Sequence, residues 1–183
     1  IVFNFQGRDW QRWFEPVALD DNVNIAEDEV KIISLFGYDA FEDWVLDGSS
    51  NLNIITYPVY GTLTTPELTD DSDLDLAQWI TSYSPNENYF GTDEIRFTVE
   101  NSGNSNGASE EAIISILISP INDAPILSSI GSQEVNEDDD LSIPLGYSDS
   151  DGDELSVVVI SSNDNVSISL EGSTLNLDPS ANY

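Results

Sequence analysis

The side chains able to do chemistry in this 183-residue chain are almost all oxygen donors. The sequence holds 35 Asp and Glu against 4 Lys and Arg, a net charge of −31, and it has no His, Cys or Met. Cysteine nucleophiles, Cys/His zinc sites, disulfides and histidine-based acid–base catalysis are therefore excluded. Carboxylates, amides and hydroxyls are left, and these are the groups that bind hard cations such as calcium.

The charge also limits the partners of the chain. Nucleic acid is excluded because binding to its phosphates depends on Lys and Arg, and an anionic membrane surface repels the chain for the same reason. No stretch of 18 apolar residues exists, so we expect no membrane insertion. Acidic pairs are too abundant to single out a glycosidase pair, and we expect no enzyme activity. Acidity with many Ser, Thr, Asn and Asp residues favours an extracellular location.

The apolar residues indicate the frame that carries these donors. With 39% hydrophobic and 10% aromatic residues, the composition is that of a folded protein. Short apolar stretches fall at strand spacing, many with the two-residue period of a β-strand, and turn residues separate them, which predicts an all-β sandwich. The expected strands are 23–25, 32–35, 52–55, 95–99, 112–118, 141–143, 155–160, 166–170 and 174–177. Residues 73–80 are expected to form a helical turn.

The sequence repeats once along the chain. The tripeptide Gly-Tyr-Asp at 37–39 recurs as Gly-Tyr-Ser-Asp from residue 146, and Leu63 aligns with Leu175, so the offsets are 146 − 37 = 109 and 175 − 63 = 112. Residues 85–89 match 179–183 at an offset of 94, which predicts an insertion of 112 − 94 = 18 residues within about 64–84 of the first repeat.

These offsets predict three parts. They are an N-terminal extension or end of a preceding domain at 1–15, a first repeat at 16–123, and a second repeat at 124–183. The second repeat lacks counterparts of the last two strands of the first. An open sandwich leaves strand edges unpaired, so we expect the chain to be part of a longer protein or to be completed by another chain.

Several motifs resemble those of one known family. The linker Ile121-Asn122-Asp123-Ala124-Pro125 is similar to the inter-repeat linker of cadherins and bacterial cadherin-like repeats. So are the run 88–93 before the strand 95–99 and the acidic loop at 146–155, Gly-Tyr-Ser-Asp-Ser-Asp-Gly-Asp-Glu-Leu. The resemblance covers residues 16–183. It implies tandem Greek-key β-sandwiches of the cadherin-like, Ig-like type, as found in large secreted bacterial surface adhesins.

The resemblance also implies calcium at the junction of the repeats. A calcium ion takes about six to eight oxygens, and two adjoining domains can pool them. Gly152 permits the tight turn that brings the acidic side chains of its loop together. The alternative is a set of solvated acidic turns, which favour Asp, Asn and Gly for backbone reasons alone. The implied ligands are Glu27, Asn88 or Glu87, Asn122, Asp123, Asp149 and Asp151, with Asp153 in reserve.

The function that the resemblance implies is a non-catalytic extracellular repeat of a bacterial adhesin, acting as a calcium-stiffened spacer. Its partners would be other repeats of the same or neighbouring chains, and a surface protein or polysaccharide.

Two alternatives arise from the aromatic segment 1–14, which belongs to neither repeat. It could add as a strand to a neighbouring subunit and build a filament. Alternatively, Trp10 and Trp13 could stack on sugars, as in a carbohydrate-binding or accessory domain of a polysaccharide-degrading enzyme.

Overall fold

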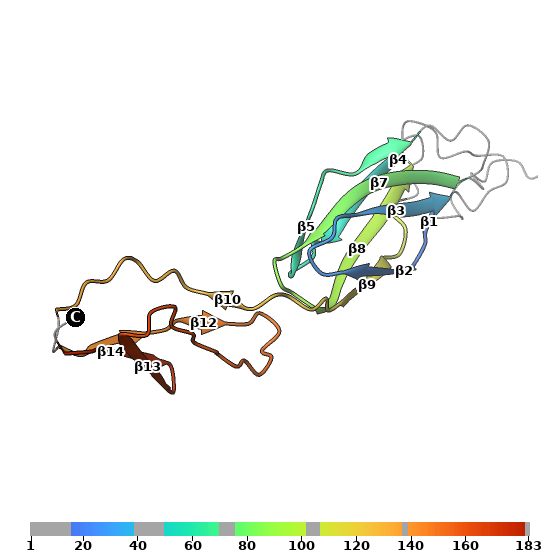
Figure 1. Ribbon diagram of the computed structural model, residues 1–183. Helices are drawn as coiled ribbons and strands as arrows, with labels where there is room; N and C mark the ends of the chain where they lie inside the picture. Colours follow the sequence, from blue (N-terminus) through green and yellow to red (C-terminus); the bar gives the residue numbers. More distant parts are fainter. Residues whose placement is uncertain (1–15, 39–49, 70–75, 102–106, 137–138, 182–183) are drawn as a thin grey trace, which may run out of the picture. The chain divides into compact units, whose positions relative to one another are not determined.

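The chain forms two units built from β-strands (Figure 1). The computed structural model describes residues 16–38, 50–69, 76–101, 107–136 and 139–181. The units are Ile1–Ile121 and Asn122–Tyr183. Across the described residues there is no helix, and hence none that could span a membrane. The prediction of an all-β chain is confirmed.

Two sheets make up the first unit. One has the strand order β1 (Val17–Ala18), β3 (Lys31–Tyr38), β7 (Leu76–Pro85), β5 (Gly61–Leu63), with β6 (Glu67–Thr69) also paired to β7. The other has the order β2 (Asp21–Ala26), β9 (Ala112–Ser119), β8 (Gly91–Asn101), β4 (Ser50–Thr56). β2 and β9 are parallel, and the other ladders are antiparallel.

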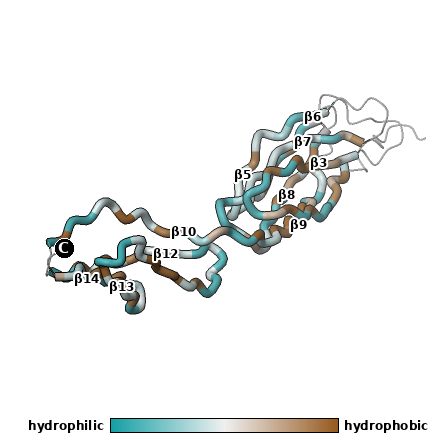
Figure 2. The backbone as a smooth tube through the Cα atoms, viewed as in Figure 1, coloured by the Kyte–Doolittle hydropathy of each residue, from teal (hydrophilic) through white to brown (hydrophobic). Residues whose placement is uncertain are grey.

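The core of the first unit lies between these sheets. Strand side chains alternate between the two faces, and along β7 and β9 every second residue is buried. Figure 2 shows hydrophobic residues along the strands of this unit. The β8–β9 pair supplies seven of the fourteen core residues, so half of the core depends on this hairpin. The core consists of Val23, Ile25, Ile33, Leu35, Ala77, Trp79, Tyr83, Ile95, Phe97, Val99, Ala112, Ile114, Ile116 and Ile118.

The second unit has a smaller set of strands. A three-stranded sheet has the order β11 (Leu141–Pro144), β14 (Thr174–Pro179), β13 (Val166–Glu171), and β10 (Ile126–Leu127) pairs with β12 (Tyr147–Ser148). Lys31 pairs with Tyr83 in the first unit, and Leu141 pairs with Leu177 in the second. The repeat offsets relate these two pairs, so β11 and β14 correspond to β3 and β7.

Two strand-level predictions are wrong. No helical turn forms at 76–80, the part of 73–80 that is described, because these residues begin β7 and place Ala77 and Trp79 in the core. Apolar residues there suit both a helical and a strand period. Residues 155–160 form no strand ladder with any described residue. In the first unit the strand in this place is β4, which pairs with β8, and residues 139–181 hold no counterpart of β8.

The predicted alignment of the two repeats is also wrong in one place. This place lies between β5 and β7 of the first unit and between β13 and β14 of the second. Gly61 pairs with Pro85, and Val166 pairs with Pro179. β5 therefore corresponds to β13, and Gly61 does not correspond to Gly172. Between these pairs the first unit spans 85 − 61 = 24 residues and the second 179 − 166 = 13. The hairpin of the first unit is longer by 24 − 13 = 11 residues, where the sequence predicted 18.

Candidate functional site

The acidic loop of the second unit, residues 149–153, follows β12. Hydrogen bonds to the side chain of its first residue, Asp149, hold the loop together. Asp149 Oδ1 accepts the backbone N–H of Asp151 at 2.9 Å and that of Asp153 at 3.2 Å. Gly152 has φ +77°, a left-handed conformation that glycine adopts without a steric penalty. The loop is thus an aspartate turn in which one carboxylate satisfies two backbone donors.

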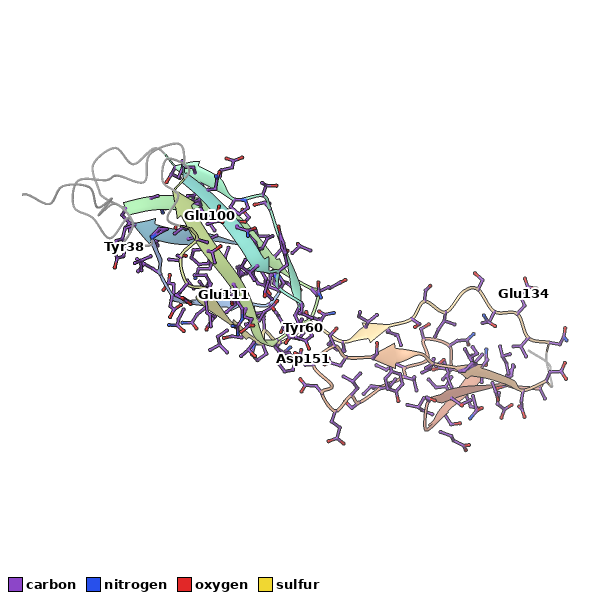
Figure 3. The ribbon with its side chains drawn as sticks, turned by 180° about the vertical axis from the view of Figure 1, so that it is seen from behind. Tyr38, Tyr60, Glu100, Glu111, Glu134 and Asp151 are labelled. Carbon is purple, nitrogen blue, oxygen red and sulfur yellow. The ribbon has the colours of Figure 1, made fainter. Side chains whose placement is uncertain are left out.

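The linker is attached to this loop. The N–H of Asp123 donates to Asp151 Oδ2 at 2.6 Å, and Asn122 Nδ2 donates to the carbonyl of Asp123 at 2.7 Å. Asp151, labelled in Figure 3, and Asp149 are partly buried, as is Asp123, whereas Asn122 and Asp153 are exposed. Hydrogen bonds therefore connect the five predicted ligands that lie in the second unit.

Glu27 is a buried carboxylate of the first unit. It follows β2, is 2% exposed, and accepts the N–H of Ile121 on Oε1 at 2.6 Å. Its own N–H donates to the carbonyl of Ser119 at 2.9 Å. A buried carboxylate needs such donors, because burying a charge without them costs on the order of several kcal/mol. Glu27 thus holds the chain where it leaves β9.

Glu87 and Asn88 lie in the exposed turn between β7 and β8. The N–H of Asn88 donates to Asp28 Oδ1 at 3.0 Å, and Asn88 and Asp28 both have positive φ angles, 56° and 60°. Asn88 is therefore tied to the turn that also contains Glu27. The sequence patterns did not single out Asp28, although its place directly after Glu27 in an acidic turn was a usable signal.

These carboxylates are not gathered into a ready-made metal centre. Wherever the chain is described, no group of three or more Asp or Glu side chains lies close enough to hold a metal ion. Each carboxylate has two oxygens with about four acceptor positions, and the hydrogen bonds above use only some of them. The donors therefore fit calcium chemically.

Asp93, at the start of β8, is a buried acidic residue that the sequence patterns missed. It is 8% exposed. Its Oδ1 accepts the N–H groups of Val59 at 2.9 Å and Glu94 at 3.0 Å, and its Oδ2 accepts the N–H of Tyr60 and the hydroxyl of Tyr83, each at 2.9 Å. The bonds from Val59 and Tyr60 fasten the chain that follows β4 to the start of β8, and the bond from Tyr83 joins β7 to the same carboxylate. The role of Asp93 is structural.

The phenol of Tyr83 should make the first unit less stable at high pH. Burial raises the pKa of Tyr83 above its ordinary value of 10.0, and the hydrogen bond to Asp93 raises it further. As pH rises above about 10, the unfolded chain loses this proton while the folded chain keeps it, so stability falls. Tyr83→Phe should show a shallower loss above about pH 10 in urea unfolding. An unchanged slope would contradict this origin.

Comparisons with known proteins place the chain among Ig-like folds. It is similar to an endo-fucoidan hydrolase of glycoside hydrolase family 107 (18% identity, 92% of this chain and 24% of that chain, TM-score 0.40). Tandem Ig domains of titin (10%, 93% and 83%, 0.37) and the Ig1-2 module of the Drosophila receptor protein tyrosine phosphatase DLAR (13%, 91% and 84%, 0.32) are also similar. No curated protein matches. The profile of the family described as bacterial Ig domain matches residues 14–116 and 122–183, and the chain belongs to this family.

Proposed function

We propose that this chain is a non-catalytic extracellular spacer of a bacterial surface adhesin, and that calcium stiffens the linker between its cadherin-like repeats. One observation supports the calcium part above others. The linker is held by carboxylates at both of its ends: Ile121 donates to Glu27 within the first unit, and Asp123 donates to Asp151 within the second. A single residue, Asn122, separates these two attachments. Backbone N–H groups on both sides of Asn122 thus donate hydrogen bonds to carboxylates.

The charge of the chain supplies the physical reason for a cation. A net charge of −31 makes the acidic side chains repel one another, and the repulsion is greatest where carboxylates share a short segment. Bound calcium would offset this charge and bridge the oxygens. The side chains that would hold it are Glu27, Glu87, Asn88, Asn122, Asp123, Asp149, Asp151 and Asp153.

Family membership supports the cellular setting of the proposal. Bacterial Ig-like domains are usually extracellular or surface-exposed and typically non-catalytic. In this setting, other repeats of the same or neighbouring chains and a surface protein or polysaccharide are the proposed partners. The filament and sugar-binding alternatives depend on residues 1–14, including Trp10 and Trp13, which lie outside the described residues.

Calorimetric titration of calcium into metal-free chain tests the proposal. We expect binding in the micromolar-to-millimolar range, as for other extracellular calcium modules, together with a raised Tm. Asp151→Asn and Glu27→Gln should each weaken binding about tenfold or more, because each removes a charge but keeps an oxygen that can accept the backbone N–H. Glu171→Gln and Glu110→Gln, at exposed positions, are the matched controls. No heat and no change in Tm would remove calcium from the proposal.

A further inference from the structure

The first unit has a groove on the outer face of the sheet that contains β2, β9 and β8. Its volume is about 520 Å³, within the range of roughly 300 to 1,000 Å³ that is usual for small-molecule sites. Outward side chains of the three strands form the floor, and Val59 and Tyr60, which follow β4, form a wall. All the residues that line the groove lie in the first unit, so the groove belongs to that unit alone.

Two rows of side chains cross the three strands and make up the floor. By pairing register, the rows are Asn22, Ser115 and Glu94 in one, and Asn24, Leu117 and Thr92 in the other. The two amides and two hydroxyls among them make no side-chain hydrogen bond with any described residue. Leu117 lies between two of these polar side chains and is 50% exposed. The floor therefore combines unpaired hydrogen-bonding groups with exposed apolar surface.

Hydrogen bonds and ring stacking hold the wall in place. The N–H groups of Val59 and Tyr60 donate to the carboxylate of Asp93, each at 2.9 Å, and the carbonyl of Tyr60 accepts the N–H of Asn86 at 2.8 Å. The ring of Tyr60, labelled in Figure 3, stacks on that of Tyr89 with centroids 4.1 Å apart and planes 4° apart. Tyr60 is still 44% exposed. The wall thus offers an aromatic surface that a ligand does not have to order.

The charges around the groove limit the ligand to an uncharged one. Among the described residues that line the groove there is no Lys or Arg, and the chain carries a net charge of −31, so sulfated, phosphorylated or carboxylated ligands are repelled. The two acidic residues of the groove are already engaged. Asp93 accepts four hydrogen bonds, and Glu94 accepts Arg96 Nε at 2.9 Å. Neither carboxylate is therefore free to select a cationic ligand.

The remaining groups match the chemistry of a sugar. A pyranose ring carries C–H groups on its faces and hydroxyls around its edge. The electron-rich face of an aromatic ring attracts C–H groups, so Tyr60 and Leu117 suit the faces of the sugar. Amide and hydroxyl side chains both donate and accept hydrogen bonds, so those of the floor suit its hydroxyls.

We propose that this groove binds a segment of an uncharged polysaccharide. A sugar ring stacks on Tyr60 and contacts Leu117, while Asn22 and Asn24 bond its hydroxyls. This inference deepens the proposed function, on which it rests for the polysaccharide partner and the extracellular setting. Calcium has no part in it, and the groove is a different place from the aromatic segment 1–14.

Nuclear magnetic resonance of the isotope-labelled full chain tests the proposal, with cellohexaose, laminarihexaose, mannohexaose and xylohexaose as probes. We expect at least one of them to bind with a Kd of about 1 mM or below and to shift the amide signals of 22–24, 92–94 and 115–117. Tyr60→Ala should weaken binding about tenfold or more, because it removes the stacking surface. Asn24→Ala should weaken it about threefold, as expected for one lost hydrogen bond.

Two exposed residues outside the groove supply matched controls. Tyr57→Ala and Asn53→Ala remove the same side-chain types and should leave binding unchanged. Leu117→Glu gives a second block of the groove and should also weaken binding about tenfold. Its side chain points away from the core, so the fold is kept, and the unshifted ladder amides of β8 and β9 report this for every variant.

Three results would overturn the proposal. The first is the absence of any shift with all four probes at about 10 mM. The second is binding that Tyr60→Ala and Leu117→Glu leave unchanged. The third is a set of shifts confined to residues 1–14, which would assign sugar binding to that segment. The titration contains no calcium, so its failure leaves the calcium-stiffened linker standing, and failure of calcium binding leaves the groove standing.

Discussion

Replacement of Asp93 by alanine is expected to lower the free energy of unfolding of the first unit by about 4 kcal/mol. The substitution removes the acceptor of four hydrogen bonds, including the one from the buried Tyr83 hydroxyl. A buried donor that loses its partner costs about 1 to 3 kcal/mol. The N–H groups of Val59 and Tyr60 lie nearer the surface and can recover part of this through water, so the total is below the sum of four such costs.

Asp93→Asn keeps the shape of the side chain but changes which hydrogen bonds it can form. The amide keeps one oxygen acceptor but turns its NH₂ group toward donors that the second carboxylate oxygen accepted, so we expect a loss of about 2 kcal/mol or more. Glu67→Ala, at an exposed position of β6, is the control and should change stability by less than about 0.5 kcal/mol. Urea unfolding measures all three variants. A loss below about 1 kcal/mol for Asp93→Ala would show that the four bonds do not stabilise the fold.

Alanine at two equivalent isoleucines is expected to have very different effects. Ile33→Ala should lower the stability of the first unit by about 3 kcal/mol, because Ile33 is enclosed by both sheets. Ile143→Ala, at the matching position of the second unit, should cost less than about 1 kcal/mol, because its side chain is still partly exposed and little contact is lost. The same residue type is removed in both units, so the difference measures how completely each core is closed.

Hydrogen exchange of the amides in the strand ladders measures the effects of Ile33→Ala and Ile143→Ala without separating the two units. Amides of the β3–β7 ladder report on the first unit, and those of the β11–β14 ladder report on the second. Equal costs would contradict the view that Ile143 is less completely buried than Ile33.

The sequence predicts strands well where one face is buried. The alternation along β8 corresponds directly to the core positions of Ile95 and Phe97, and the apolar run of β9 supplies Ile114 and Ile116. The mostly apolar run at 155–160 also predicts a strand, yet no ladder forms there with any described residue, because pairing depends on a neighbouring strand as well as on side-chain pattern. The β7 segment was misjudged for another reason: its apolar spacing fits two periods, and tertiary packing decides between them.

As with the strands, only part of the candidate site is predictable from the sequence. The spacing of Asp149, Asp151 and Asp153 around Gly152 predicts an acidic turn, and a turn held by Asp149 is present. The bond from Asp123 to Asp151 joins residues 28 apart, and no local pattern indicates it. Asp93 was missed for the same reason, since its partners Val59 and Tyr60 lie 34 and 33 residues away. Local chemistry can be read from sequence, whereas long-range hydrogen bonds need the fold.

Small-angle X-ray scattering of the full chain with and without calcium tests the stiffened spacer most directly. We expect calcium to narrow the distribution of interatomic distances and to lower the flexibility seen at higher angles. Asp151→Asn should remove both effects, and Glu171→Gln should leave them unchanged. Identical scattering curves with and without saturating calcium would show that calcium does not stiffen the spacer, because a stiffened spacer cannot keep the same range of conformations when the ion binds.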